Sequence, residues 1–196
     1  YNSVNIGLPI ATYVLGDATF VVPALVLQMA VLSPVVIAGL DRGAKGVGKS
    51  VVAGLTAPVV LAAFAGFGVS AAAWTVPEPV LAPLEILGGA SIPLILMSFG
   101  ASLTGEKVLQ SHRGPTLTAT ALKLVGMPAV AWVVARLLGL DGQEMYAALI
   151  LCALPAAQNV YNYAATYRSG EVICRDTVFL TTFLALPAML LIAGVF

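Results

Sequence analysis

Charged residues are scarce in this chain of 196 residues. Lys and Arg number 9, Asp and Glu number 9, and the charged share is 9%, against about 25% in soluble domains. Hydrophobic residues reach 60%, and the mean hydropathy is +0.99. This excludes an ordinary soluble domain, and the net charge of zero gives no indication of a nucleic-acid partner. The composition predicts an all-α, polytopic membrane protein.

Cysteine and acidic residues within the apolar segments are also rare. Cys152 falls inside an apolar segment and Cys174 in a charged loop, so we expect no disulfide between them. No Asp or Glu stands beside the two proline sites described below, so no coupling carboxylate is evident there. We predict neither a cofactor nor a metal site.

Charges and Gly/Pro clusters divide the chain into membrane-length segments. A bilayer core of about 30 Å takes about 20 helical residues per crossing. The expected crossings are residues 1–15, 18–40, 51–73, 79–103, 115–138, 145–167 and 177–196. Basic residues concentrate in alternate loops, which the positive-inside rule places in the cytoplasm, with the C-terminus outside. The sequence thus predicts about seven membrane helices.

Two Leu-Pro steps interrupt these segments, one ending at Pro9 and one at Pro155. A proline inside a helix removes a backbone hydrogen bond, and lipid offers no other partner for the freed carbonyl. Paired discontinuous helices in the two halves of a chain are typical of the substrate site of a secondary transporter. We therefore predict that Pro9 and Pro155 break two antiparallel helices at the point where these cross.

Amide side chains flank both prolines. They are Asn2 and Asn5 before Pro9, and Gln158, Asn159 and Asn162 after Pro155. Half-helices that start near the prolines would direct free N–H groups at the crossing, where they favour a carboxylate. We expect Asn5, Gln158 and Asn159 to bind the substrate, and Asn2 and Asn162 to line a vestibule. The alternative is that the amides only join helices and the prolines only kink them.

Lys123 is a charge within a predicted crossing. Intramembrane ionisable residues are functional candidates by default, so we include Lys123 among the substrate-binding residues as an electrostatic contributor. The alternative is that its side chain extends to the cytoplasmic interface.

A nucleotide-binding motif stands between two of the crossings. Residues 43–50 match G-x-x-x-x-G-K-[ST], with Gly43, Gly48, Lys49 and Ser50 at the fixed positions. Such a loop works at a strand-to-helix junction of an α/β domain, and here it stands between two hydrophobic segments. We interpret residues 41–50 as a basic cytoplasmic linker and predict no nucleotide partner.

The order of crossings also predicts internal symmetry. Residues 1–40 would end a first inverted repeat, residues 41–50 would link the repeats, and residues 51–196 would form a second repeat of five helices. The chain begins at Tyr1 inside a membrane-like motif, and equal repeats require three further crossings. We therefore expect that an N-terminal part of the protein precedes Tyr1.

Three stretches stand out by their order and spacing: NIGLPI at residues 5–10, residues 76–103 with SIPL and FGASL, and ALPAAQNV at residues 153–160 followed by Tyr167. Together they resemble the auxin efflux carrier family of membrane transport proteins. The resemblance implies ten helices in two inverted five-helix repeats, with the broken fourth and ninth helices crossing at Pro9 and Pro155. The short linker is closer to the bacterial type, which implies a bacterial inner membrane.

The same resemblance implies a function. Members of the family move organic anions, auxin in plants and small carboxylates such as malate or malonate in bacteria. We therefore expect a permease that carries a small organic anion by alternating access, and not an enzyme, with a homodimer as one option. The alternatives are a sodium-coupled carrier of the bile-acid symporter kind and a membrane sensor or scaffold without transport.

Overall fold

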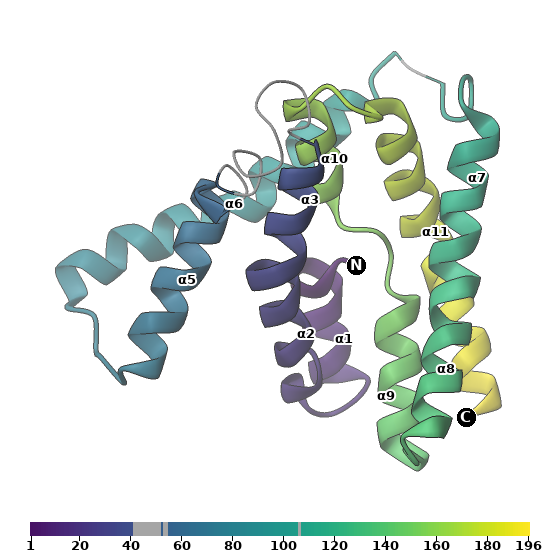
Figure 1. The fold of residues 1–196 in the computed structure, drawn as a ribbon, viewed down its shortest axis with the longest axis horizontal. Coiled ribbons are helices and arrows are strands. Elements are labelled where there is room, and N and C mark those ends of the chain that lie inside the picture. The colour runs from purple at the N-terminus through teal and green to yellow at the C-terminus, as the bar shows by residue number, and fades with distance from the viewer. Residues whose placement is uncertain (41–51, 53–54, 106) are drawn as a thin grey trace. The chain divides into compact units, whose positions relative to one another are not determined.

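A computed structural model describes residues 1–40, 52, 55–105 and 107–196 of the chain. The predicted linker and its nucleotide-binding motif lie outside these residues. Within them the regular elements are all helical, and none is a strand (Figure 1). In chain order they are η1 (Ser3–Gly7), α1 (Leu8–Tyr13), η2 (Ala18–Phe20), α2 (Val22–Leu27), η3 (Gln28–Leu32), α3 (Ser33–Leu40), α5 (Pro58–Ala71), α6 (Glu78–Ser102), α7 (Arg113–Ala121), η4 (Leu122–Gly126), α8 (Met127–Leu137), α9 (Gly142–Ala153), α10 (Gln158–Thr166) and α11 (Glu171–Val195).

Within the described ranges, three continuous helices are long and apolar enough to cross a membrane. They span Val22–Leu40, Arg113–Leu137 and Glu171–Val195, with 19, 25 and 25 residues, and Val60–Ala71 is a shorter apolar helix. The all-helical, membrane-type fold agrees with the composition. The count of seven crossings and the inverted repeats stay predictions.

The chain forms two compact units. Unit 1 comprises Tyr1–Pro23 and Phe99–Phe196, and unit 2 comprises Ala24–Ser98. In unit 2, α5 packs against η3, and Met29, Phe64 and Phe67 line an apolar groove between them. Every predicted site residue lies in unit 1.

Helix α9 is central to unit 1, where it contacts α8, η4 and α11. Apolar residues of α1 and the turn after it, Ala11 and Leu15, form a buried cluster with Ile150 and Leu154 on the α9 side. Hydrogen bonds also join the N-terminal segment, residues 1–15, to the segment that contains α9 and Pro155. Gln143 Nε2 donates to Leu15 O at one end of the two segments, and Asn2 N–H donates to Pro155 O at the other. The two segments therefore run antiparallel and side by side.

The turn after α1 carries one of the few acidic residues. Gly16 has a φ of +79°, which favours glycine, and Thr19 N–H donates to Asp17 Oδ1 at 2.8 Å. That backbone hydrogen bond lowers the pKa of the exposed Asp17 carboxyl below its ordinary value. The turn thus keeps a charged carboxylate at this end of unit 1.

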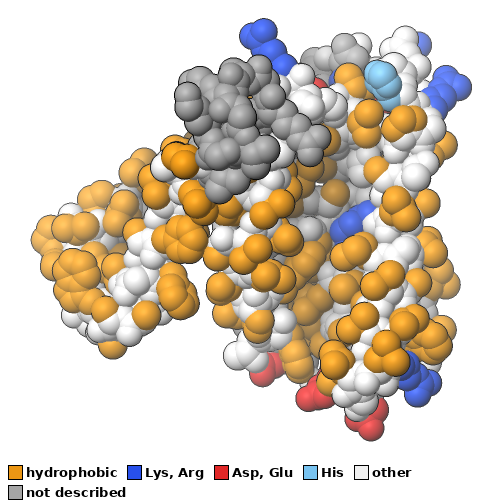
Figure 2. Space-filling model, in the orientation of Figure 1, with side chains coloured by type: hydrophobic (Ala, Val, Ile, Leu, Met, Phe, Trp, Pro, Cys, Tyr) orange, Lys and Arg blue, Asp and Glu red, His pale blue; other side chains and the backbone are white. Residues whose placement is uncertain are grey.

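Charge is separated along unit 1. On the face shown in Figure 2, acidic side chains gather at the end where α8 meets α9, and most basic ones gather at the opposite end. Hydrophobic side chains cover the surface between these ends. Such a band between polar ends is the pattern expected of a protein that spans a bilayer.

Proline does not break most of these helices. Three prolines follow a π turn that ends two residues earlier: Pro9 after η1, Pro34 after η3 and Pro128 after η4. In a π turn each N–H bonds five residues back, as Met127 N–H does to Leu122 O. The wider turn accommodates the proline ring and its missing donor, so the chain stays helical.

Candidate functional site

The chain is interrupted between α9 and α10. Helix α9 ends at Ala153, the backbone is extended at Leu154 (ψ 147°) and Ala157 (ψ 139°), and α10 begins at Gln158. Pro155 has no N–H and disfavours a helical residue before it, which explains the extended Leu154. Leu154 and Ala157 are buried, so protein covers this backbone. The second half-helix begins three residues beyond the proline.

The first predicted break needs correction, because Pro9 does not interrupt its helix. Gly7 has helical angles, and Pro9 is the second residue of α1. The π turn η1 absorbs the proline, as described above. The non-helical residue is Asn2, with φ −80° and ψ 74°.

The two segments meet at Asn2 and Pro155, where Asn2 N–H donates to Pro155 O at 2.9 Å. Asn2 Nδ2 and Asn5 Nδ2 both donate to Gln158 Oε1, at 3.3 and 3.1 Å, and Asn5 N–H donates to Asn2 Oδ1 at 3.2 Å. We call Asn2, Asn5 and Gln158 the amide cluster. Asn2 and Gln158 are buried, so Asn2 lies within the amide cluster, and its predicted place in a vestibule stays a prediction.

Several amide donors near the amide cluster have no hydrogen-bond partner among the residues that the structure describes. Asn159 and Asn162 are half-buried, and within the described part of the chain their side chains make no hydrogen bond. Gln158 Nε2 likewise donates to none of the described residues. All four asparagines of the chain lie in these two segments. The site therefore combines a fixed amide cluster with donors that can take a ligand.

The space beside Gly7 is tight. A Cβ on Gly7 would stand 3.0 Å from Leu154 Cδ1 and 3.3 Å from Asn2 O. A Cβ at this position requires the Leu154 side chain or the backbone of η1 to shift. The Gly-Leu-Pro step thus matters for packing at Gly7 more than for a break at Pro9.

Lys123 reaches the break from η4. Its Nζ donates to Cys152 O at 2.7 Å and lies 5.9 Å from the centre of the Tyr1 ring. The half-buried side chain is thus directed toward the end of α9. It contacts the backbone of the break and makes no hydrogen bond to the amide cluster.

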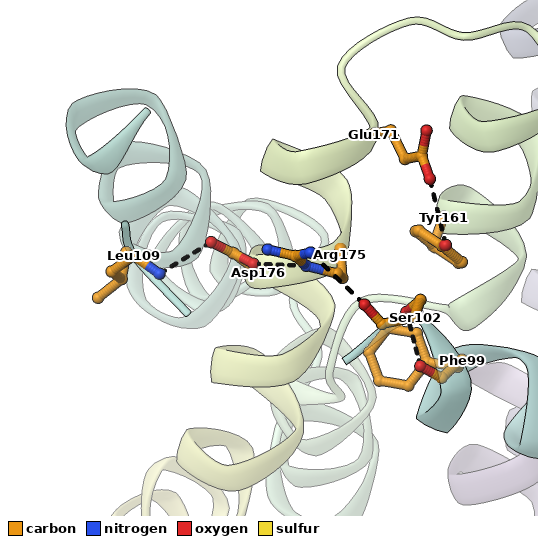
Figure 3. Close-up of polar contacts among 7 residues, drawn as sticks. All are labelled: Phe99, Ser102, Leu109, Tyr161, Glu171, Arg175 and Asp176. Carbon is orange, nitrogen blue, oxygen red and sulfur yellow. Dashed lines mark hydrogen bonds and ion pairs between the residues drawn. The ribbon is translucent and has the colours of Figure 1, made fainter. Parts of the chain in front are cut away.

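A second polar network, which the sequence analysis missed, joins α11 to the loop before α7 (Figure 3). Asp176 accepts from Arg175 Nε at 2.9 Å and from Leu109 N–H at 2.9 Å, and Arg175 Nη1 donates to Ser102 O at 3.5 Å. The sequence placed both charges in a cytoplasmic loop, but they lie buried in the first turns of α11. The pairing of the two opposite charges makes their burial possible. In the sequence, the adjacency of Arg175 and Asp176 was the feature that could have indicated a buried ion pair.

The sequence comparisons identify the class of protein. A membrane helix interrupted beside polar side chains is a feature of secondary transporters. Residues 44–193 match the model of the family described as Membrane transport protein, and the chain belongs to this family. It is the auxin efflux carrier family that the motifs resemble. This chain is therefore an integral membrane protein of a transport family.

One curated relative supports the same class. Over 107 residues the chain is 27% identical to a protein of Methanocaldococcus jannaschii named as an uncharacterized transporter. The match covers 55% of this chain and 34% of that protein. The aligned part of the chain thus spans about a third of the relative's length.

Proposed function

We propose that the chain is part of a secondary transporter that moves a small organic anion, a carboxylate first of all, by alternating access. The observation that carries this proposal is the amide cluster at the interrupted helix. Two antiparallel segments contribute to it, and a rearrangement of either segment would alter the site. Such coupling between site and segment is what alternating access requires.

The hydrogen-bonding inventory favours an anion over a cation. Gln158 Oε1 and Asn2 Oδ1 already accept from amide cluster groups. Gln158 Nε2 and Asn159 Nδ2 remain as donors for a ligand, while the side-chain oxygens of Asn5 and Asn159 remain as acceptors for a hydroxyl or a water molecule. The first N–H groups of α10 also lack partners within their helix, and its N-terminus carries a partial positive charge. A carboxylate presents only acceptors, so it complements this set.

We assign Gln158 and Asn159 to direct substrate contact. Asn162 lies one turn further along α10 and would line the approach, while Asn2 and Asn5 would hold Gln158 in place. Basic loops in the cytoplasm and an external C-terminus remain the proposed topology, in a bacterial-type inner membrane.

Transport by the complete protein in proteoliposomes tests the proposal. Radiolabelled malate and malonate are compared with a neutral sugar and an organic cation. Asn159→Ala should lower malate transport at least about tenfold, because it removes a hydrogen bond to a charged ligand. Gln110→Ala, which removes an exposed loop amide, is the matched control. Normal malate transport by Asn159→Ala would refute the site assignment.

The same assay separates the rival functions. Malate transport that requires an inward sodium gradient would replace the proposal with a sodium-coupled carrier of the bile-acid symporter kind. Saturable malate binding without flux would replace it with a sensor or scaffold.

A further inference from the structure

The interruption after α9 separates the two partners of one helical hydrogen bond. In a continuous α-helix the Ala156 N–H would donate to Cys152 O, four residues earlier. Here Cys152 O accepts from Lys123 Nζ at 2.7 Å, and Ala156 N–H donates to Thr181 Oγ1 at 3.1 Å. Each half of the lost bond therefore has its own side-chain partner, one from η4 and one from α11.

Thr181 is suited to this position by its chemistry. It is fully buried, and its Oγ1 lies 2.7 Å from Thr177 O and 3.2 Å from Val178 O. The hydroxyl proton can be donated to its own helix while a lone pair accepts from Ala156. Valine would keep the shape and remove both functions. Serine would keep both.

Lys123 holds the other end of the lost bond. An ammonium group has donors only, so it matches a carbonyl that has lost its helical donor. In the described part of the chain no carboxylate pairs with Lys123, and the Cys152 carbonyl is its hydrogen-bond acceptor. The contact with the Tyr1 ring places the same ammonium beside the start of the first segment.

We propose that Lys123 and Thr181 are positioning residues, which replace the lost helical hydrogen bond and hold residues 154–157 extended. They thereby fix Pro155 O against Asn2 and place the first residue of α10, Gln158, in the amide cluster. Lys123 thus acts on the backbone of the site and not on the anion. The inference rests on the proposed function for its transport readout only.

Amide hydrogen exchange of the full chain in nanodiscs tests the geometry without any substrate. Thr181→Val should speed exchange at Ala156 about tenfold, because the buried N–H loses its acceptor. Thr181→Ser should exchange within about twofold of the wild type, because its hydroxyl still accepts. The matched control is Thr182→Val, since the Thr182 hydroxyl bonds only to Val178 O among the described residues. Unchanged exchange at Ala156 in Thr181→Val, or an equal rise in Thr182→Val, would overturn the proposal.

Malate transport tests how Lys123 acts. Lys123→Met and Thr181→Val should change KM and turnover in the same proportions. The double variant should transport malate no more slowly than the more impaired single variant, because both residues support one segment. Lys107→Met, in an exposed loop, should transport normally. A raised KM in Lys123→Met alone, with additive losses in the double variant, would make Lys123 a substrate ligand and overturn its positioning role. Absence of malate transport in the wild type would count against the proposed function, while exchange at Ala156 would still decide the positioning role.

Discussion

Substitution of Gln158 separates the structural role of the amide cluster from substrate binding. Gln158→Leu removes the oxygen that accepts from Asn2 and Asn5 and leaves two amide donors without it. A buried donor left unpaired costs about 1–3 kcal/mol. Because Asn5 is only partly buried, we expect a total loss of about 2–4 kcal/mol in stability, or a melting temperature lowered by roughly 5–15 °C.

Gln158→Glu should keep the stability of the protein and abolish substrate binding. The carboxylate still accepts from both asparagines, and the N-terminus of α10 favours its charge, so stability should stay near that of the wild type. A substrate carboxylate about 4 Å away would be repelled by about 4 kcal/mol, which corresponds to a loss of affinity of about a thousandfold. Malate transport should therefore disappear.

Both variants are measured by intrinsic-fluorescence melting in detergent and by malate flux at alkaline pH, with Gln110→Glu as the control for an added charge. Malate transport by Gln158→Glu within twofold of the wild type would refute the anion site. Wild-type melting of Gln158→Leu would refute the hydrogen-bonded amide cluster.

Further predictions concern the packing and folding of unit 1. Gly7→Ala should destabilise the protein by about 1–3 kcal/mol in chemical denaturation, since its Cβ meets Leu154 and Asn2. The control Gly194→Ala, which has open space around it, should be neutral or stabilise by up to about 1 kcal/mol. Equal effects of the two substitutions would contradict the close packing at Gly7. Asp176→Ala should lower the free energy of unfolding by about 3–5 kcal/mol, because it removes the carboxylate that pairs with the buried Arg175. The control Asp141→Ala, at an exposed position, should change it by no more than about 0.5 kcal/mol. A small loss for Asp176→Ala would show that the pair does not anchor α11. Pro155→Ala adds the N–H that would bond to Leu151 O in a continuous helix and so favours that helix. Malate transport should be lost, while the amount of folded protein, assayed by size-exclusion chromatography, is kept. Full transport would show that the break is not required.

The sequence predicted the interruption at Pro155 well, because its causes are local. The proline removes a donor, extends the residue before it and is followed directly by the amides that start α10. The same reasoning was wrong at Pro9, where a π turn absorbs an equivalent Leu-Pro step. Whether a proline breaks a helix or follows a π turn depends on the neighbouring segments, and a Leu-Pro dipeptide does not encode them.

Sequence patterns could not predict which residues, distant in the chain, contact one another. Lys123 was identified as an intramembrane charge, but its contact with the Cys152 carbonyl requires two helices to be placed side by side. Arg175 and Asp176 were assigned to a loop because charged residues separate the apolar segments, and their partners Ser102 and Leu109 are distant in sequence. In both cases the residue type was informative and the partner was not predictable.

The most direct test of the central claim is the distance between bound substrate and the amide donors. Solid-state NMR of the full chain in liposomes, with carbon-13-labelled malate and nitrogen-15-labelled Asn and Gln side chains, measures this distance through dipolar coupling. We predict a coupling that corresponds to a hydrogen-bonded contact, about 3 Å between donor nitrogen and acceptor oxygen, which is lost in Gln158→Glu. Bound malate without coupling to any side-chain amide would contradict the account.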